Sequence, residues 1–337
     1  MQKKSAYHVA VMGATGAVGQ EMVAILEERQ FPVAQLSLFA SERSAGTTLP
    51  FGGREIDIQT WTAGAFTGID IVLGATDGAM SKKFTPHAVA AGAVVIDNSS
   101  AWRMAHDVPL VVPEVNGHAI AGHHGIIANP NCATVQLVMA LKPLHDAATL
   151  RRVVVTTFQS VSGTGRNAMD ELMEQTRSLL AFREVTPAVY DRQIAFNCIV
   201  NWDADPVTGD TEEETKIINE TLKILELPHL GLSATTIRVP VFRSHGESVN
   251  VETENKLSVN VARSRLSAFP GVIVLDDPTR KIYPTPLDAT GHDAVYIGRV
   301  REDTSIVNGL NLWIVADNLR KGAALNAIQI AEALILG

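Results

Sequence analysis

The sequence predicts a doubly wound parallel α/β sheet in the first half of the chain and a separate α+β domain in the second half. In the first half, short apolar runs alternate with amphipathic segments, and strand–helix–strand units of this kind form a parallel sheet covered on both faces. The second half has more strand-like sequence than such a sheet needs. A chain of 337 residues that is 46% hydrophobic is long enough for two domains with a core each.

The expected strands of the first half are YHVAVM, QLSLFA, DIVLGAT, AVVIDNS and GIIAN. After the first of these, residues 17–30 place Val18, Met22, Ile25 and Leu26 at helical spacing. Residues 81–92 are also expected to be helical, with Pro86 interrupting the first turn. These elements predict a Rossmann-type sheet.

In the second half, we expect helices over 135–147, 167–180 and 211–226. Residues 150–163 are β-rich, 233–253 alternate like two paired strands, and 293–303 and 310–317 add two more. A last helix, capped by Asp317 or Asn318, is expected to return to the first domain. The predicted boundaries are therefore 1–131 with 317–337 for the first domain and 132–316 for the second.

Composition and charge argue against several kinds of partner. The net charge is −8 and no run of Lys or Arg is present, which disfavours nucleic acid and anionic membranes. No apolar stretch reaches the roughly 18 residues that span a bilayer, and the first residues enter a strand with no cleavable apolar segment. The two cysteines, Cys132 and Cys198, form no disulfide framework. A cytoplasmic protein is expected. His123 and His124 have no third ligand at a credible spacing, so no metal site is predicted.

A glycine-rich loop, GATGAVG, follows the first expected strand. Its glycines, Gly13, Gly16 and Gly19, permit a tight turn in which backbone N–H groups approach a pyrophosphate at the start of the helix. The second strand ends in SERSAG, where Ser41, Arg43 and Ser44 suit a 2′-phosphate, because a guanidinium matches phosphate oxygens bidentately. These residues predict NADP rather than NAD. Glu42, if it points inward, favours NAD instead, and a solvated polar loop is a further alternative.

Cys132 lies between a Pro-Asn turn and the start of an apolar helix. A thiol at a helix N-terminus is near the positive end of the helix dipole, which favours the thiolate. Arg238 and His245 flank a short extended segment, RVPVFRSH, and an imidazole is the usual acid or base beside a catalytic thiol. Taken alone, Cys132 could equally be a small buried apolar residue.

The residues named so far belong to a longer series of motifs. In chain order these are GATGAVG, FASERSAG, DNSSAWR, VPEVN, NPNCAT, QSVSGTG, EEETK, RVPVFRSHGES and DNLRKGAALNA. With them the sequence resembles the aspartate-semialdehyde dehydrogenase family over nearly its whole length. A sibling family, N-acetyl-γ-glutamyl-phosphate reductase, shares the fold and the cysteine, but Asn131 before the cysteine resembles the aspartyl enzymes. One departure is NCIVNWD, in which Val200 stands where a proline is expected.

The resemblance implies the NADP-dependent interconversion of L-4-aspartyl phosphate and L-aspartate 4-semialdehyde, in the biosynthesis of lysine, threonine, methionine and diaminopimelate. It implies a homodimer built on the second domain. In the implied mechanism Cys132 is the nucleophile, which forms a thioester, and His245 is the acid–base. The other implied substrate contacts are Gln159 and Asn131 for the acyl group, Arg103 and Lys216 for phosphate, Arg238 for the α-carboxylate and Glu213 for the α-amino group.

The resemblance also extends the cofactor site. It implies that Gly13, Thr15, Gly16, Ala17 and Val18 hold the pyrophosphate, that Thr76 and Asn98 lie at later strand ends, and that Gly163 and Asn318 reach the nicotinamide. The choice of Glu213 over Glu212 and Glu214 rests only on the spacing to Lys216. Three alternatives stay open: the sibling reductase, a related acyl-thioester reductase such as a malonyl-CoA reductase, and a non-catalytic NADP-binding paralogue.

Overall fold

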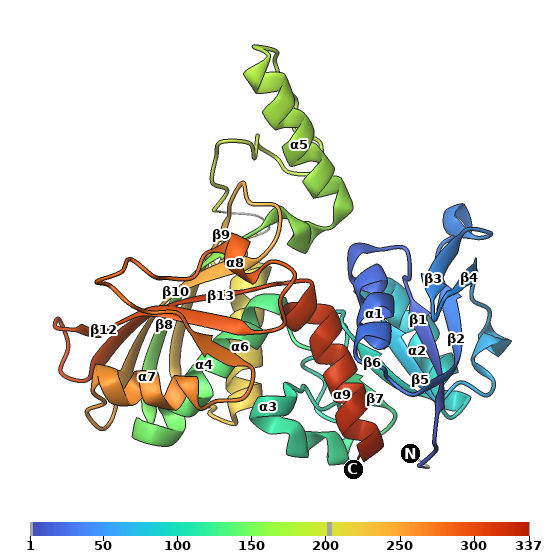
Figure 1. Cartoon of the computed structure of the whole chain (residues 1–337), viewed down its shortest axis with the longest axis horizontal. Coiled ribbons are helices and arrows are strands. Elements are labelled where there is room, and N and C mark those ends of the chain that lie inside the picture. The colour runs from blue at the N-terminus through green and yellow to red at the C-terminus, as the bar shows by residue number, and fades with distance from the viewer. Residues whose placement is uncertain (1–2, 201–203, 337) are drawn as a thin grey trace. The chain divides into compact units, whose positions relative to one another are not determined.

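The computed structural model describes residues 3–200 and 204–336, and the chain divides into two units. One unit comprises Met1–Asn131 with Ala323–Gly337, and the other comprises Cys132–Gly322. Figure 1 labels most of the helices and strands of both units. Within the described residues, no helix has both the length and the apolar character to cross a membrane.

A seven-stranded sheet forms the centre of the first unit, in the order β3-β4-β2-β1-β5-β6-β7. The strands are β1 (Tyr7–Met12), β2 (Val33–Phe39), β3 (Thr48–Phe51), β4 (Arg54–Gln59), β5 (Ile71–Gly74), β6 (Val94–Asp97) and β7 (Ile126–Ala128). All neighbours are parallel except the β3–β4 hairpin, which is antiparallel and was not predicted from the sequence. The predicted doubly wound sheet is confirmed.

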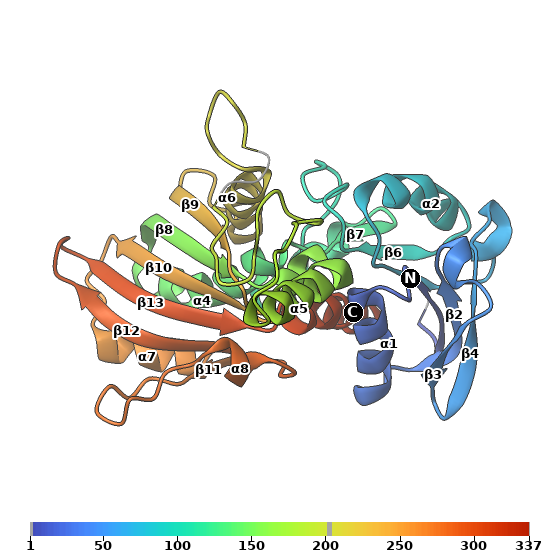
Figure 2. The same cartoon turned by 90° about the horizontal axis from the view of Figure 1, so that it is seen from above.

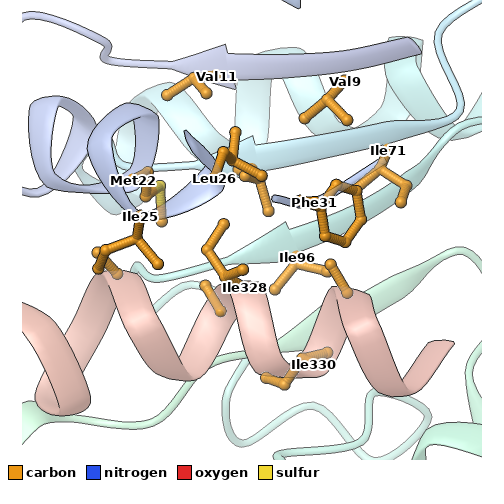
Figure 3. Packing of buried hydrophobic residues seen from close by; sticks show 14 of the residues in the cluster. Val9, Val11, Met22, Ile25, Leu26, Phe31, Ile71, Ile96, Ile328 and Ile330 are labelled. Atoms are coloured by element: carbon orange, nitrogen blue, oxygen red, sulfur yellow. The ribbon is translucent and has the colours of Figure 1, made fainter. Parts of the chain in front are cut away.

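Helices cover both faces of this sheet, as the alternation along β1 requires. Val9 and Val11 point to one face and pack with α1 (Ala17–Glu28) and α9 (Leu325–Leu336), which also lie against each other (Figure 3). Ala10 and Met12 point to the other face and pack with α2 (Gly78–Ala90). The short α3 (Pro113–Asn116) contacts α9. The last helix of the chain therefore completes the core of the first unit.

Helix α2 begins earlier than the sequence predicted. Asp77 caps it by accepting a hydrogen bond from the Met80 backbone N–H at 2.8 Å, so the helix begins at Gly78. Pro86 consequently lies well inside the helix rather than in its first turn, and the prediction of an interrupted first turn was wrong. The cap explains this, since an Asp N-cap stabilises a start that hydrophobic spacing alone does not reveal.

The second unit is built on a six-stranded sheet in the order β11-β12-β13-β10-β8-β9 (Figure 2). Its strands are β8 (Leu150–Gln159), β9 (Gly231–Arg238), β10 (His245–Thr253), β11 (Val272–Val274), β12 (Val295–Asp303) and β13 (Gly309–Ala316). Helices α4 (Cys132–Ala148), α6 (Glu212–Leu225) and α7 (Val259–Ser267) pack against the sheet. The remaining helices are α5 (Arg166–Leu180) and the short α8 (Pro286–Ala289).

Strands β9 and β10 are not paired with each other, contrary to the sequence prediction. Strand β8 lies between them, parallel to β9 and antiparallel to β10. The chain reaches β9 after α5 and α6, as a parallel connection requires, and β10 then occupies the other side of β8. The separation brings the ends of three strands together at Gln159, Arg238 and His245.

Asp317 lies in the segment between β13 and α9. Its carboxylate accepts hydrogen bonds from the backbone N–H groups of Leu319, at 3.0 Å, and Arg320. A π-helical turn (Arg320–Ala324) then leads into α9. Of the two residues proposed as the cap, Asp317 and Asn318, it is therefore Asp317 that caps this segment. The Asn318 side chain forms hydrogen bonds with Ser160, Ser162 and Ser244 instead.

Candidate active site

Cys132 is the first residue of α4, and His245 is the first residue of β10. The Cys132 Sγ lies 3.2 Å from the His245 Nε2, which is within hydrogen-bonding distance for sulfur. The imidazole is fully buried, while Cys132 is partly accessible. A thiol and an imidazole far apart in sequence are therefore in direct contact, the arrangement required of a nucleophile with an adjacent acid or base.

The tautomer of His245 follows from its other nitrogen. The Ser160 backbone N–H donates to Nδ1 at 3.0 Å, so Nδ1 is an acceptor and the proton of the neutral ring is on Nε2, facing the sulfur. Burial, together with the positive charge of Arg238, lowers the pKa of His245 to about 3. The ring is therefore neutral near pH 7 and presents an N–H donor to Cys132.

Arg238 and Gln159 lie beside this pair. They are paired in the parallel ladder of β9 and β8, and both are buried. The Arg238 Nη1 donates to the Ser160 carbonyl at 2.8 Å. A Cβ atom on Gly163 would lie 3.0 Å from that nitrogen and 3.3 Å from the His245 Cε1, so the arginine and the imidazole both lie close to the backbone of Gly163. The structure thus brings Gln159, Gly163, Arg238 and His245 together.

Helix α6 contributes a carboxylate and an amine to the same unit. The Glu213 Oε1 accepts a hydrogen bond from the Gln159 Nε2 at 3.1 Å, and Lys216 Nζ lies 3.9 Å from the Glu213 Oε2. Lys216 is also 2.8 Å from Glu212, which is largely exposed. Glu214 instead closes a capping box with Thr211 at the start of the helix. Of the three glutamates, Glu213 is the one that reaches Gln159.

Asn318 is buried within the second unit. Its Oδ1 accepts hydrogen bonds from the hydroxyls of Ser160 and Ser162 and from the Ser244 backbone N–H, at 2.9–3.2 Å. The Ser160 hydroxyl also lies 3.1 Å from the His245 Nδ1. Asn318 therefore supports the loop that holds the imidazole, a contact that the sequence prediction did not include.

The first unit contains a cleft of about 660 Å³ at the carboxyl ends of its central strands. Parallel sheets of this type bind nucleotides at that edge. Gly13 has a φ of +78°, and a Cβ there would lie 2.4 Å from the Ala75 carbonyl oxygen, so the turn requires glycine. The lining contains six of the predicted cofactor residues, Gly13, Thr15, Gly16, Ser41, Arg43 and Thr76, and nine others, Met12, Phe39, Ala40, Glu42, Thr60, Trp61, Ala75, Asp77 and Met80.

The other predicted cofactor residues of this unit lie around that cleft. The Ser44 hydroxyl is 3.3 Å from the Thr15 hydroxyl. Ala17 and Val18 begin α1, and the partly buried Val18 side chain packs against the core. The Asn98 Nδ2 donates to the Gly74 carbonyl at 2.8 Å, which fixes Asn98 at the end of β6.

Arg103 and the turn before Cys132 are held by an asparagine network. Arg103 donates to the backbone carbonyls of Asn98, at 2.6 Å, and Asn129, at 3.0 Å. The Asn129 Nδ2 donates to the Asn98 Oδ1, and the Asn129 Oδ1 accepts from the Asn326 Nδ2 of α9, both at 2.7 Å. The network joins three segments of the first unit, and Asn131 follows directly, also buried.

Comparison with known proteins assigns the family. Residues 8–123 match the family model "Semialdehyde dehydrogenase, NAD binding domain", and residues 141–321 match "Semialdehyde dehydrogenase, dimerisation domain". Aspartate-semialdehyde dehydrogenases from Aquifex aeolicus and Bacillus subtilis are 49% and 47% identical, over 98% and 97% of each chain. The chain belongs to the aspartate-semialdehyde dehydrogenase family. The family predicted from the sequence motifs is confirmed, and with it an oxidoreductase of amino-acid biosynthesis.

Solved aspartate-semialdehyde dehydrogenase structures share the fold. One from Vibrio cholerae, described as complexed with ASA, has a TM-score of 0.96, 45% identity and 99% coverage of both chains. One from Candida albicans, described as with NADP, has a TM-score of 0.75, 27% identity and 98% coverage of both chains. The first unit is accordingly the nicotinamide-dinucleotide-binding domain of this family member.

Several residues, some near Cys132 and one in the nucleotide cleft, were not predicted from the sequence. Ser160 contacts the His245 Nδ1 through both its backbone N–H and its hydroxyl. Trp61 follows a hairpin that was not predicted. Gly322 closely approaches Cys132, because a Cβ there would lie 2.9 Å from the Cys132 Cβ. Only the glycine motif around Gly322 could have drawn attention to it. Within the described residues, no cluster of three His, Cys, Asp or Glu side chains could hold a metal ion.

Proposed function

We propose that this protein catalyses the reductive dephosphorylation of L-4-aspartyl phosphate to L-aspartate 4-semialdehyde, and the reverse reaction, with NADP. The observation that carries the proposal is the 3.2 Å contact between the Cys132 sulfur and the His245 Nε2 in a chain whose relatives are named for this semialdehyde. Thiol chemistry suits both halves of the reaction, since sulfur attacks an acyl phosphate and later departs from carbon.

In the biosynthetic direction the Cys132 thiolate attacks the acyl carbon, the bond from carbon to the phosphate oxygen breaks, and phosphate leaves a Cys132 thioester behind. Bound NADPH supplies the hydride that reduces this thioester. The Cys132 thiohemiacetal then collapses: the carbon–sulfur bond breaks, the aldehyde leaves and the thiolate is restored. His245 holds its proton at Nε2, shares it first with the sulfur and then with the thiohemiacetal oxygen, and recovers it as the carbon–sulfur bond breaks.

The substrate contacts are proposed on the chemistry of the side chains. Arg238 is a buried cation whose planar fork fits an α-carboxylate, and Glu213 supplies a negative charge for the α-amino group. The Gln159 amide donates a hydrogen bond to Glu213, and Gln159 is paired with Arg238 in the β8–β9 ladder. Asn131 is proposed to orient the acyl group, and Arg103 and Lys216 to bind phosphate.

The preference for NADP over NAD is proposed from the end of β2. Ser41 and Arg43 line the nucleotide cleft, with Ser44 beside Thr15, so one guanidinium and several hydroxyls are available for a 2′-phosphate. Glu42 also lines the cleft, which makes Arg43 the deciding residue. Arg43→Ala should weaken NADP binding roughly 10- to 100-fold, the value of one charge-assisted hydrogen-bonded pair, and leave NAD binding unchanged. Equal affinities for NADP and NAD in the parent protein, unchanged by Arg43→Ala, would refute the preference.

A homodimer is proposed from the description of the matched second-unit family as a dimerisation domain. Sedimentation analysis of the purified protein tests it. A cytoplasmic location is also proposed, because the mechanism needs Cys132 as a free thiol and a reducing compartment keeps it so.

The activity is tested by following NADP⁺ reduction with aspartate semialdehyde and phosphate, beside Cys132→Ala. Phosphate-dependent turnover that the substitution abolishes is the expected result. An acetylated amine needs no carboxylate partner, so Glu213→Gln should reduce activity on the aspartyl substrate far more than activity on an N-acetyl-γ-glutamyl substrate. Equal losses of activity on the two substrates would favour the sibling reductase. Tight NADP⁺ binding without any turnover would identify a non-catalytic paralogue.

A further inference from the structure

A carboxylic side chain that the proposed mechanism does not use lies directly behind the catalytic pair. Glu247 is two residues beyond His245 on β10, and both are fully buried. Side chains two apart on a strand point to the same face, so Glu247 lies beneath the same helical layer as the imidazole. The two oxygens of Glu247 have no hydrogen-bond partner among the described residues.

The residues that face Glu247 are uncharged. In the ladders, Thr157 of β8 and Ile314 of β13 lie directly opposite it, and both are buried. Burial raises the pKa of Glu247 well above its usual value, and the nearby Gln136 of α4 lowers it to a smaller extent. The two side chains nevertheless lie outside hydrogen-bond geometry. The titratable neighbour on its own strand is His245, which is neutral near pH 7. An ionised carboxylate would therefore be buried without a counter-charge, which is strongly unfavourable.

Gln136 lies on the same face of α4 as Cys132, just as Glu247 lies on the same face of β10 as His245. It is four residues further along α4, one helical turn on the same face, and it is buried. A helical turn advances about 5.4 Å and two strand residues about 6.6 Å, so the spacings along α4 and β10 nearly match. Cys132 with His245 and Gln136 with Glu247 are thus two successive contacts between the same helix and the same strand.

We propose that Glu247, as a neutral carboxylic acid, forms with Gln136 a positioning pair that sets the separation of α4 and β10 and hence the alignment of the Cys132 sulfur with the His245 imidazole. The proposal rests on the proposed catalytic roles of Cys132 and His245. A protonated carboxyl supplies a donor and an acceptor, and the Gln136 amide and the Thr157 hydroxyl supply complementary groups that also have no described partner. An apolar side chain of the same size would provide none of these.

The test compares Glu247→Gln, which keeps a neutral hydrogen-bonding group of the same shape, with Glu247→Leu, which removes it. Glu252→Gln, a partly exposed position further along β10, is the matched control. All variants carry Cys198→Ser, because Cys198 is an exposed thiol that would react alongside Cys132. The readouts are kcat and KM, the rate of Cys132 alkylation by iodoacetamide as a function of pH, and the infrared C=O band of a protonated carboxylic acid.

The expected result is that Glu247→Gln keeps the kcat and the pH midpoint of alkylation of the parent and loses one protonated-carboxyl band at neutral pH. Glu247→Leu should lower kcat and the alkylation rate about 10- to 100-fold, the cost of a misplacement near 1 Å, with KM for the cofactor unchanged. Alkylation and infrared spectra need no substrate, so they test Glu247 even if the proposed reaction is wrong.

Three results would overturn the proposal. The first is a shift of the alkylation midpoint by more than about half a pH unit in Glu247→Gln, which would show that the carboxyl is ionised in the parent. The second is the absence of a protonated-carboxyl band assignable to Glu247. The third is a folded Glu247→Leu protein with unchanged kcat. Where the leucine variant does not fold, Gln136→Met replaces it, with the same expected loss and the same contrary outcome.

Discussion

Replacing Gly322 with alanine should slow the enzyme while leaving it folded. A Cβ at this position would lie 2.9 Å from the Cys132 Cβ and 3.3 Å from its Cα and carbonyl oxygen. Carbon atoms in contact are about 3.5–4.0 Å apart, so the two segments must separate by roughly 0.6–1 Å. Cys132 begins α4, whose following residues are buried, and therefore the strain falls on the position of the thiol.

The size of the effect follows from this displacement. Moving the sulfur by that amount would take its distance to the His245 Nε2 from 3.2 Å to near the limit of a hydrogen bond to sulfur. A misplacement of about 1 Å costs about 100-fold in rate, equivalent to about 2.7 kcal/mol in the barrier. The added methyl group should cost about 1–3 kcal/mol in unfolding free energy, which is tolerable for a chain of this size.

The assay measures kcat/KM together with the rate of Cys132 alkylation, and both should fall. Gly117→Ala is the control, because its φ of −53° suits alanine and a Cβ there meets open space. A folded Gly322→Ala protein with kcat/KM within about threefold of the parent would refute the reasoning, since it would mean that the sulfur tolerates the displacement.

Three further predictions concern stability and cofactor binding. Thr211→Ala removes the capping box at the start of α6 and should lower the unfolding free energy by about 1 kcal/mol in urea titrations; an unchanged midpoint would contradict the cap. The folded pKa of His245, about 3, lies below its ordinary value of 6.5, so between these pH values the unfolded chain binds a proton that the folded chain excludes. Stability should therefore decline as pH falls from about 6.5 to about 3, and His245→Gln should flatten that decline; an equal slope in the variant would be the contrary result. Trp61 lines the nucleotide cleft, so NADP binding should change tryptophan fluorescence, and Trp61→Phe should abolish most of that change; persistence of the signal would place the cofactor elsewhere.

The sequence predicted best those features that depend on local pattern. The glycine loop at Gly13 and the thiol at the start of a helix could be read directly, because turn chemistry and helix starts depend on neighbouring residues. The contact between Cys132 and His245 followed from chemistry rather than geometry: few side chains besides an imidazole can serve a thiol near neutral pH.

What the sequence could not provide depends on strand order and burial. The alternation over residues 233–253 was correct for β9 and β10, but nothing in it could show that β8 lies between them. Glu247 reads as an ordinary outward-facing glutamate until the ladders place it on the buried face beside His245. The hydrogen bonds of Asn318 to the loop behind the imidazole were not predicted, because they are long-range contacts that have no local signal.

The order in which the chain is synthesised makes α9 unusual. Its residues Ile328 and Ile330 belong to the same core as Val9 and Val11 of β1, yet on a ribosome they emerge only after the whole of Cys132–Gly322. Until then the nascent first unit exposes the apolar face that α9 will cover and lacks the amide of Asn326 that secures Asn129. The nucleotide-binding unit is therefore expected to be the last part of the protein to mature, and the nascent chain to depend on chaperones for longer than its N-terminal position suggests.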